Sequence, residues 1–143
     1  MLKEFKPKNT PPADRETISL LFQKGDFHSA PQACRKAGYQ IIEFQSDIEI
    51  GARKMLMSHR TGELLSFIHK YGIKVQYEIP ILLKAVFEAR DHHGFLKNAH
   101  RFKIYKGLET EIEKSISFLL EKGQKADAEG WQRKFESLRR EKP

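Results

Sequence analysis

Residues 20–30 read LLFQKGDFHSA and residues 118–128 read FLLEKGQKADA. In both segments an apolar run reaches Lys-Gly and then crosses a few polar residues to an alanine. A glycine at this point can take the left-handed conformation that ends a helix, and the preceding lysine complements the negative end of the helix dipole. Each segment is therefore expected to hold the end of one helix and the start of the next.

The same pattern recurs at Gly72 and Gly107, each of which has a lysine within the two preceding residues. Between these glycines, apolar residues recur at the three- and four-residue spacing of amphipathic helices. The predicted fold is mostly all-α, with about seven helices in consecutive antiparallel hairpins. One helix is expected to carry Phe95, Ala99 and Phe102 on one face and to end at Gly107. The four glycines are unevenly spaced, so the sequence does not establish a strict repeat.

The expected organisation is an extended leader over residues 1–11, a single helical domain over residues 12–138 and a solvated tail over residues 139–143. Two segments inside the domain do not fit the helical pattern. Residues 39–44 mix β-branched and aromatic residues, and residues 73–79 (IKVQYEI) alternate strictly between apolar and polar, as strands do. Because a lone strand is unstable, we favour irregular linkers for both, with a small two-stranded pairing of the two segments as the alternative.

Length and composition set bounds on the class of protein. A chain of 143 residues can fold as one domain, and the single cysteine, Cys34, excludes an internal disulfide and favours a reducing compartment. No stretch approaches the roughly 20 apolar residues that span a bilayer, and the first residues lack the apolar block of a secretory signal. We expect a cytoplasmic protein with no transmembrane segment. The net charge of +7, concentrated toward the two ends of the chain, attracts anionic partners.

Residues 20–37, LLFQKGDFHSAPQACRKA, resemble the middle of a tetratricopeptide repeat. Gly25, Asp26 and Phe27 correspond to the Gly-Asp-aromatic turn of that family, and Ala30 and Ala37 to the two alanines seven residues apart. Pro31 and the absence of a period of about 34 residues depart from the family pattern. The resemblance implies the broader class of irregular α-solenoids, built from helical hairpins, which serve as adaptor or scaffold subunits.

A few side chains of the sequence are candidates for metal binding or catalysis. Asp91, His92, His93 and His100 are candidate metal ligands, but they lack the HExxH spacing of a helical zinc site. Cys34 lies beside Arg35, which would favour a thiolate, yet a small buried cysteine is the preferred interpretation. Glycine-rich phosphate loops are missing, so no cofactor is predicted and an enzyme is the less favoured class. A small metal-dependent enzyme that uses the four candidate ligands is kept as one alternative.

Residues 97–106, KNAHRFKIYK, form the most suggestive segment because they hold several cations and no acid. The predicted basic face consists of Lys97, His100, Arg101, Lys103 and Lys106. Such a face suits an acidic protein surface or the phosphates of a nucleic acid. The favoured function is a non-catalytic protein-interaction module or adaptor that meets an acidic partner, and a nucleic-acid-binding protein is the alternative. The sequence does not indicate the oligomeric state.

Overall fold

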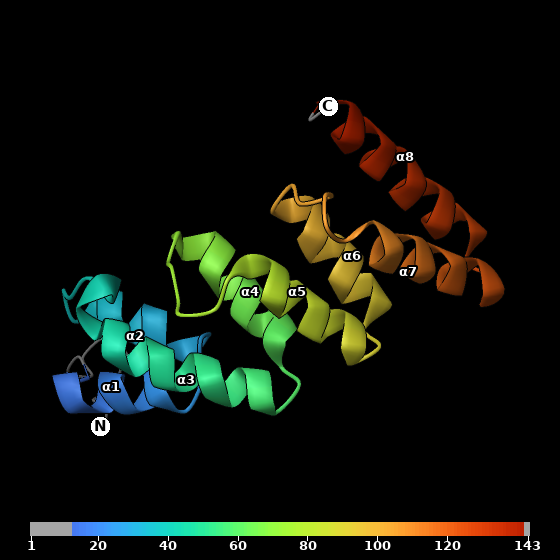
Figure 1. The fold of residues 1–143 in the computed structure, drawn as a ribbon. Helices are drawn as coiled ribbons and strands as arrows, with labels where there is room; N and C mark the ends of the chain where they lie inside the picture. Colours follow the sequence, from blue (N-terminus) through green and yellow to red (C-terminus); the bar gives the residue numbers. More distant parts are fainter. Residues whose placement is uncertain (1–12, 142–143) are drawn as a thin grey trace, which may run out of the picture. The chain divides into compact units, whose positions relative to one another are not determined.

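The computed structural model describes residues 13–141, which form eight α-helices and one 3-10 helix in the order shown in Figure 1. The bounds are α1 Arg15–Gln23, α2 Ser29–Lys36, η3 Ile41–Phe44, α3 Gln45–Met57, α4 Thr61–Tyr71, α5 Ile79–Glu88, α6 His92–Arg101, α7 Glu109–Glu121 and α8 Lys125–Glu141. The predicted all-α class is confirmed. The predicted leader over residues 1–11 lies outside the described residues, and α8 continues through exposed residues 139–141.

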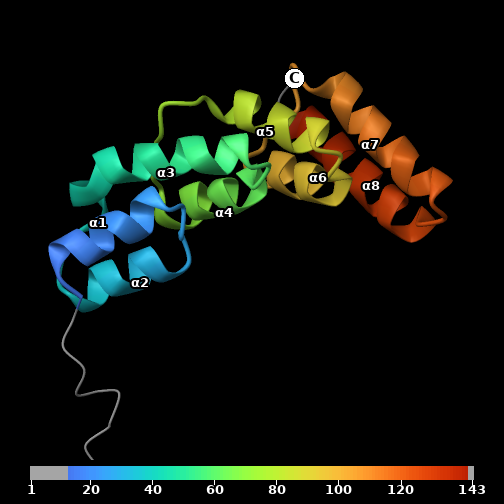
Figure 2. The same ribbon diagram turned by 90° about the horizontal axis from the view of Figure 1, so that it is seen from below.

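Residues 13–141 contain no strand, so the two-stranded alternative is wrong. Residues 41–44 form the 3-10 helix η3, because the side chains of Gln40 and Glu43 each bond a backbone N–H of this turn. Residues 73–78 form an irregular connection between α4 and α5 (Figure 2). The alternation still separates the side chains of this connection, since Ile73 is buried and Val75 and Tyr77 are half-buried, whereas Lys74 and Gln76 are exposed.

The chain divides into two compact units, residues 1–51 and 52–143. In the first unit, α2 packs against α1 and η3. Its core is aromatic: the ring of Phe22 lies 5.5 Å from that of Phe44 and 6.3 Å from that of Phe27. Cys34 is buried and donates to the Tyr39 carbonyl at 3.5 Å, and burial raises the pKa of its thiol, which removes the reactive-thiolate interpretation. The prediction of one domain over residues 12–138 stays a prediction.

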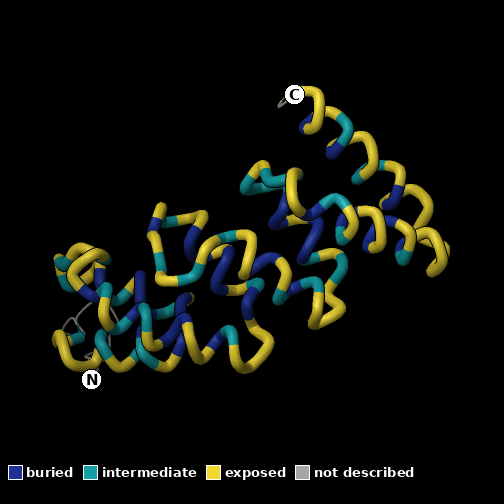
Figure 3. Tube along the Cα trace, viewed as in Figure 1, coloured by how far each residue is buried: buried dark blue, intermediate teal, exposed yellow. Residues whose placement is uncertain are grey.

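The second unit is a two-layer array of hairpins. Successive helices from α4 to α8 pack against each other, and α6 also contacts α4 and α8, while α5 contacts α7. One layer therefore holds α4, α6 and α8, and the other holds α5 and α7 (Figure 2). Helix α8 lies at the edge of this array, so it is buried only at intervals along its length (Figure 3).

Turns of one geometry recur through the described chain. The helices α1, α3, α5 and α7 are each followed by a residue in the left-handed conformation: Gly25, His59, Arg90 and Gly123. Successive members of this set are 34, 31 and 33 residues apart. The next backbone N–H in each case donates to the carbonyl five residues before it, from Asp26, Arg60, Asp91 and Gln124. Another left-handed residue follows 13 residues after each of the first three, at Gly38, Gly72 and Lys103. The backbone turns thus recur at intervals of 31–34 residues, although the residue types at these positions do not repeat.

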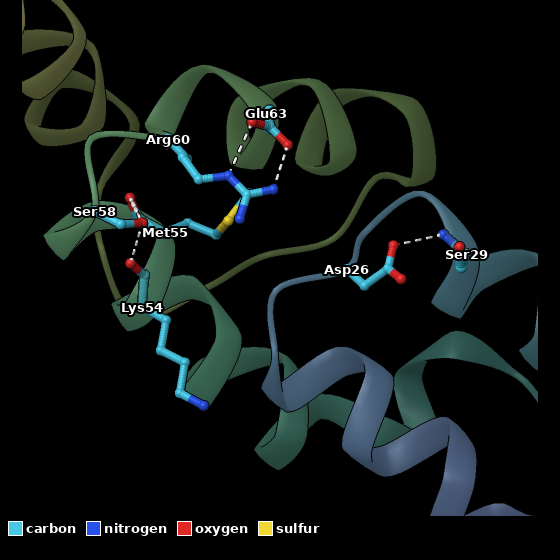
Figure 4. A network of polar contacts seen from close by, with 7 residues as sticks. All are labelled: Asp26, Ser29, Lys54, Met55, Ser58, Arg60 and Glu63. Carbon is cyan, nitrogen blue, oxygen red and sulfur yellow. Dashed lines mark hydrogen bonds and ion pairs between the residues drawn. The ribbon is translucent and has the colours of Figure 1, made fainter.

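The residue after each of these turns lies at or shortly before the start of the next helix, and its chemical interactions differ from one hairpin to the next. Asp26 and Asp91 accept the backbone N–H three residues ahead through their carboxylates, at 3.0 and 2.9 Å. Arg60 has no such acceptor; its guanidinium instead pairs with the side chain of Glu63 (Figure 4). The backbone geometry is therefore conserved between hairpins while the capping residues differ.

Candidate functional site

Helix α6 ends at Arg101 and not at Gly107, so the predicted basic face is not a single helix face. Ile104 N–H donates to the Ala99 carbonyl, and Lys103 takes the left-handed conformation, with φ 57°. This turn ends the helix. Lys97, His100 and Arg101 lie on α6, whereas Lys103 and Lys106 lie on the connection to α7.

His100 does not belong to an exposed cationic surface. Its ring contacts Trp131 and Phe135 of α8 edge-on, at centroid distances of 6.1 and 5.8 Å. Burial lowers the pKa of His100, and the nearby Lys134 acts in the same direction. The imidazole is therefore a neutral packing group between α6 and α8 at neutral pH.

Of the other four cations, the three lysines are exposed and the arginine is half-buried. Lys97, Lys103 and Lys106 are exposed, and none of the ion pairs between residues 13–141 includes them. Arg101 is half-buried, and its Nη1 donates to Ser66 Oγ of α4 at 3.2 Å. We call Lys97, Arg101, Lys103 and Lys106 the basic cluster.

A cavity of about 630 Å³ includes Phe102 in its lining, the residue between Arg101 and Lys103 in the chain. It is formed by the end of α4, the connection to α5, the first turn of α5 and Phe102 at the end of α6. Its apolar lining comes from Ile68, Ile73, Val75, Tyr77, Ile79 and Phe102, and His69 contacts the Phe102 ring edge-on at 5.4 Å. We call this cavity the apolar pocket.

Phe102 joins the two features, because it lines the apolar pocket and stands between Arg101 and Lys103 in the chain. A further hollow of about 250 Å³ is lined by Lys103, Ile104, Tyr105 and Lys106 together with Arg139 of α8. Arg139 is held by an ion pair with Glu136. The unit therefore offers an apolar recess next to exposed cations.

Sequence reasoning missed the apolar pocket. Its signal was the alternation over residues 73–79, which is typical of a strand but was interpreted as an irregular linker, with a strand as the alternative. In the structure all of residues 73–79 line the pocket, and the apolar ones are buried or half-buried while Lys74, Gln76 and Glu78 are exposed. Arg139 was also missed, since only the fold brings it next to residues that lie more than 30 positions earlier.

The four candidate metal ligands are separately engaged. Asp91 caps α6 through the N–H of Gly94, and His93 Nε2 lies 2.8 Å from Gln124 Oε1. His92 stacks on Phe118 at 4.3 Å and places Nδ1 2.8 Å from Ser115 Oγ. Within residues 13–141, no three His, Cys, Asp or Glu side chains converge as a metal-binding group would require.

None of the helices in the described part combines the length and apolarity required to cross a bilayer. Comparison of the chain with protein-family models, with curated proteins and with solved structures gave no match.

Proposed function

We propose that the chain is a non-catalytic protein-interaction module, an adaptor that binds an acidic segment of a partner protein in the cytoplasm. The observation that supports this proposal is that Phe102, which lines the apolar pocket, stands in the chain between Arg101 and Lys103 of the basic cluster. The hairpin architecture is compatible with the solenoid class that the tetratricopeptide resemblance implies. The buried, neutral Cys34 agrees with a reducing compartment.

The two features would contribute differently to binding. A volume of about 630 Å³ lies within the range of pockets that bury small ligands, and it can accept one or two large apolar side chains. Burying such an anchor supplies affinity, as in hot spots of protein interfaces. The exposed lysines of the basic cluster would raise the association rate of an acidic segment and select against basic ones.

Nucleic acid is the rival partner, since phosphates need only exposed cations. Single-stranded nucleic acids also require aromatic faces on which bases stack. Phe102 and Tyr105 are only half-exposed, and the Phe102 edge contacts His69. An acidic protein segment uses the apolar pocket as well as the cations, so it accounts for more of the site.

The proposal is tested by capturing partners from nuclease-treated native cell extract, with identification by mass spectrometry. The affected variant carries Lys97→Glu, Lys103→Glu and Lys106→Glu. The control carries Lys54→Glu, Lys84→Glu and Lys114→Glu, which reverse three exposed lysines elsewhere and change the net charge equally. The partner's affinity is then measured at low and high salt.

We expect the first variant to bind the captured partner at least about tenfold more weakly than the control does, with a reduced dependence on salt. A second variant, Val75→Lys, should weaken binding even though it adds a positive charge, because it blocks the apolar pocket. Equal binding by all variants would contradict the proposal. Capture that disappears on nuclease treatment would favour nucleic acid instead.

A further inference from the structure

The hollow of about 250 Å³ is lined by cations from two elements. Lys103 and Lys106 come from the α6–α7 connection, and Arg139 comes from α8. All three residues are exposed, and the half-buried Ile104 and Tyr105 form the rest of the lining. Positive side chains that line one small recess from separate elements suit an anionic group with several acceptor oxygens.

The guanidinium of Arg139 is held in place by its neighbours on α8. Its Nε and Nη2 donate to the carboxylate of Glu136, and Arg140 pairs with the same carboxylate at 3.5 Å. Nη1 of Arg139 has no such partner within residues 13–141. Because one carboxylate serves two guanidinium groups, this part of α8 keeps a positive charge.

The positive charge around the hollow exceeds what one carboxylate of a partner would balance. Residues 101–109 and 136–141, which include the whole lining, carry five Lys and Arg residues and three Glu residues, a net charge of +2. Among these acids, Glu109 accepts the backbone N–H of Gly107 at 2.8 Å. A phosphorylated serine or threonine carries a charge of about −2 near neutral pH and three acceptor oxygens. The phosphate therefore matches the hollow in charge and in number of acceptors.

The hollow and the apolar pocket are lined by consecutive residues. Phe102 lines the apolar pocket and Lys103 lines the hollow. Their Cα atoms are about 3.8 Å apart, as across any trans peptide bond. This adjacency is what a short segment needs in order to place an apolar side chain in one recess and a charged group in the other.

We propose that the hollow binds a phosphorylated serine or threonine of the acidic partner segment, so that phosphorylation of the partner strengthens its binding. This inference rests on the proposed function, because the same segment places an apolar side chain in the apolar pocket. The phosphate accepts hydrogen bonds from Lys103, Lys106 and Nη1 of Arg139. The partner segment is thus recognised by two chemical features, one apolar and one doubly charged.

The test measures the affinity of the full chain for synthetic acidic peptides by fluorescence anisotropy. Each peptide holds one phenylalanine and, about two to six residues away, one serine, since an extended chain advances about 3.4 Å per residue. The serine is unmodified, phosphorylated or replaced by glutamate. A series of spacings covers the unknown path of the segment between the two recesses.

Two variants of the chain are compared with the wild type. The affected variant carries Lys106→Gln and Arg139→Gln, and leaves Lys103 unchanged because it holds the left-handed turn after α6. The control carries Lys114→Gln and Arg133→Gln, which remove the same two residue types from exposed positions outside the hollow. All four replaced residues are exposed, so both variants should fold, and circular dichroism verifies this.

We expect phosphorylation to strengthen binding to the wild type and to the control at least about fivefold at one or more spacings. The affected variant should show no such gain, and glutamate should not reproduce it. Equal affinity of the phosphorylated and unmodified peptides would overturn the inference. A gain that the affected variant retains would overturn it as well.

The outcomes separate this inference from the proposed function. Unmodified peptides that bind the wild type but not Val75→Lys, with no gain from phosphorylation, would support the apolar pocket and overturn the phosphate site. A gain that requires Lys106 and Arg139, with equal binding of unmodified peptides to the wild type and Val75→Lys, would support the phosphate site and count against the apolar pocket. Binding to vesicles that contain a phosphoinositide, with no gain from peptide phosphorylation, would assign a lipid headgroup to the hollow and overturn the inference.

Discussion

Gly51 is a residue at which the packing leaves no space for a side chain. A Cβ at this position would collide with the carbonyl oxygen of Phe22 and lie 3.0 Å from Cζ of Phe27. Neither neighbour can move without disturbing the aromatic core of residues 1–51. Gly130 on α8 is the matched contrast, because a Cβ there would have no neighbour within 4 Å.

We expect Gly51→Ala to lower the free energy of unfolding by about 3 kcal/mol through overpacking. Gly130→Ala should raise it by up to about 1 kcal/mol, since alanine favours a helix over glycine. Urea denaturation followed by circular dichroism measures both changes. Equal effects of the two substitutions would show that the close approach at Gly51 is not as described.

His92 links stability to pH. Burial lowers the pKa of His92 from its ordinary value of 6.5; the nearby Arg90 and His93 add to this, and Asp91 partly opposes it. Burial also lowers the pKa of His100, and the nearby Lys134 acts in the same direction. The unfolded chain therefore takes up protons at a higher pH than the folded chain does. The free energy of unfolding should be constant above the ordinary value and fall as the pH decreases below 6.5.

The measurement compares urea denaturation of the wild type with that of the double variant His92→Gln, His100→Gln between neutral pH and about pH 5, where carboxylates contribute little. We expect the loss of stability at low pH to be smaller in the variant. An unchanged pH dependence would contradict the assignment of these two histidines as buried neutral groups.

At the scale of helices and turns, Arg90 and Gly123 hold the same left-handed position with opposite residue types. Arg90 has φ 65° and Gly123 has φ 78°. The left-handed conformation costs an L-residue with a side chain about 1 kcal/mol, which glycine avoids. Arg90→Gly should therefore raise the free energy of unfolding by about 1 kcal/mol and Gly123→Ala should lower it by about the same amount. Thermal or urea denaturation measures both changes. If the two substitutions changed the free energy of unfolding in the same direction, the shared left-handed geometry would be contradicted.

The sequence predicted the end of a helix where a glycine holds the left-handed position after it, and not where another residue type does. Gly25, Gly72 and Gly123 mark helix ends, and the helices before them were predicted because their apolar residues recur at helical spacing. The period was missed because His59 and Arg90 hold the intervening left-handed positions, and these residue types do not signal such a turn. The prediction that the helix carrying Phe95 continues to Gly107 was wrong for the same reason, because Lys103 holds the left-handed position that follows the end of α6.

For the molecule as a whole, the sequence predicted the cations of the candidate site but not their surroundings. Lys97, Lys103 and Lys106 are exposed as expected, because a lysine among few acids has no local partner. Which of the remaining cations pack inward depends on contacts far along the chain. Arg101 reaches Ser66 and His100 reaches Trp131, and no local pattern contains these pairs. The apolar pocket likewise depends on helices that only the fold brings together.

The most direct test of the central claim is an NMR titration of the full chain, labelled with nitrogen-15, with the acidic segment of the captured partner. Recognition through the apolar pocket and the basic cluster predicts amide shift changes concentrated in residues 68–80 and 101–106, which vanish in the variant Val75→Lys. Changes confined to other residues, with these two segments unaffected at saturation, would contradict the account.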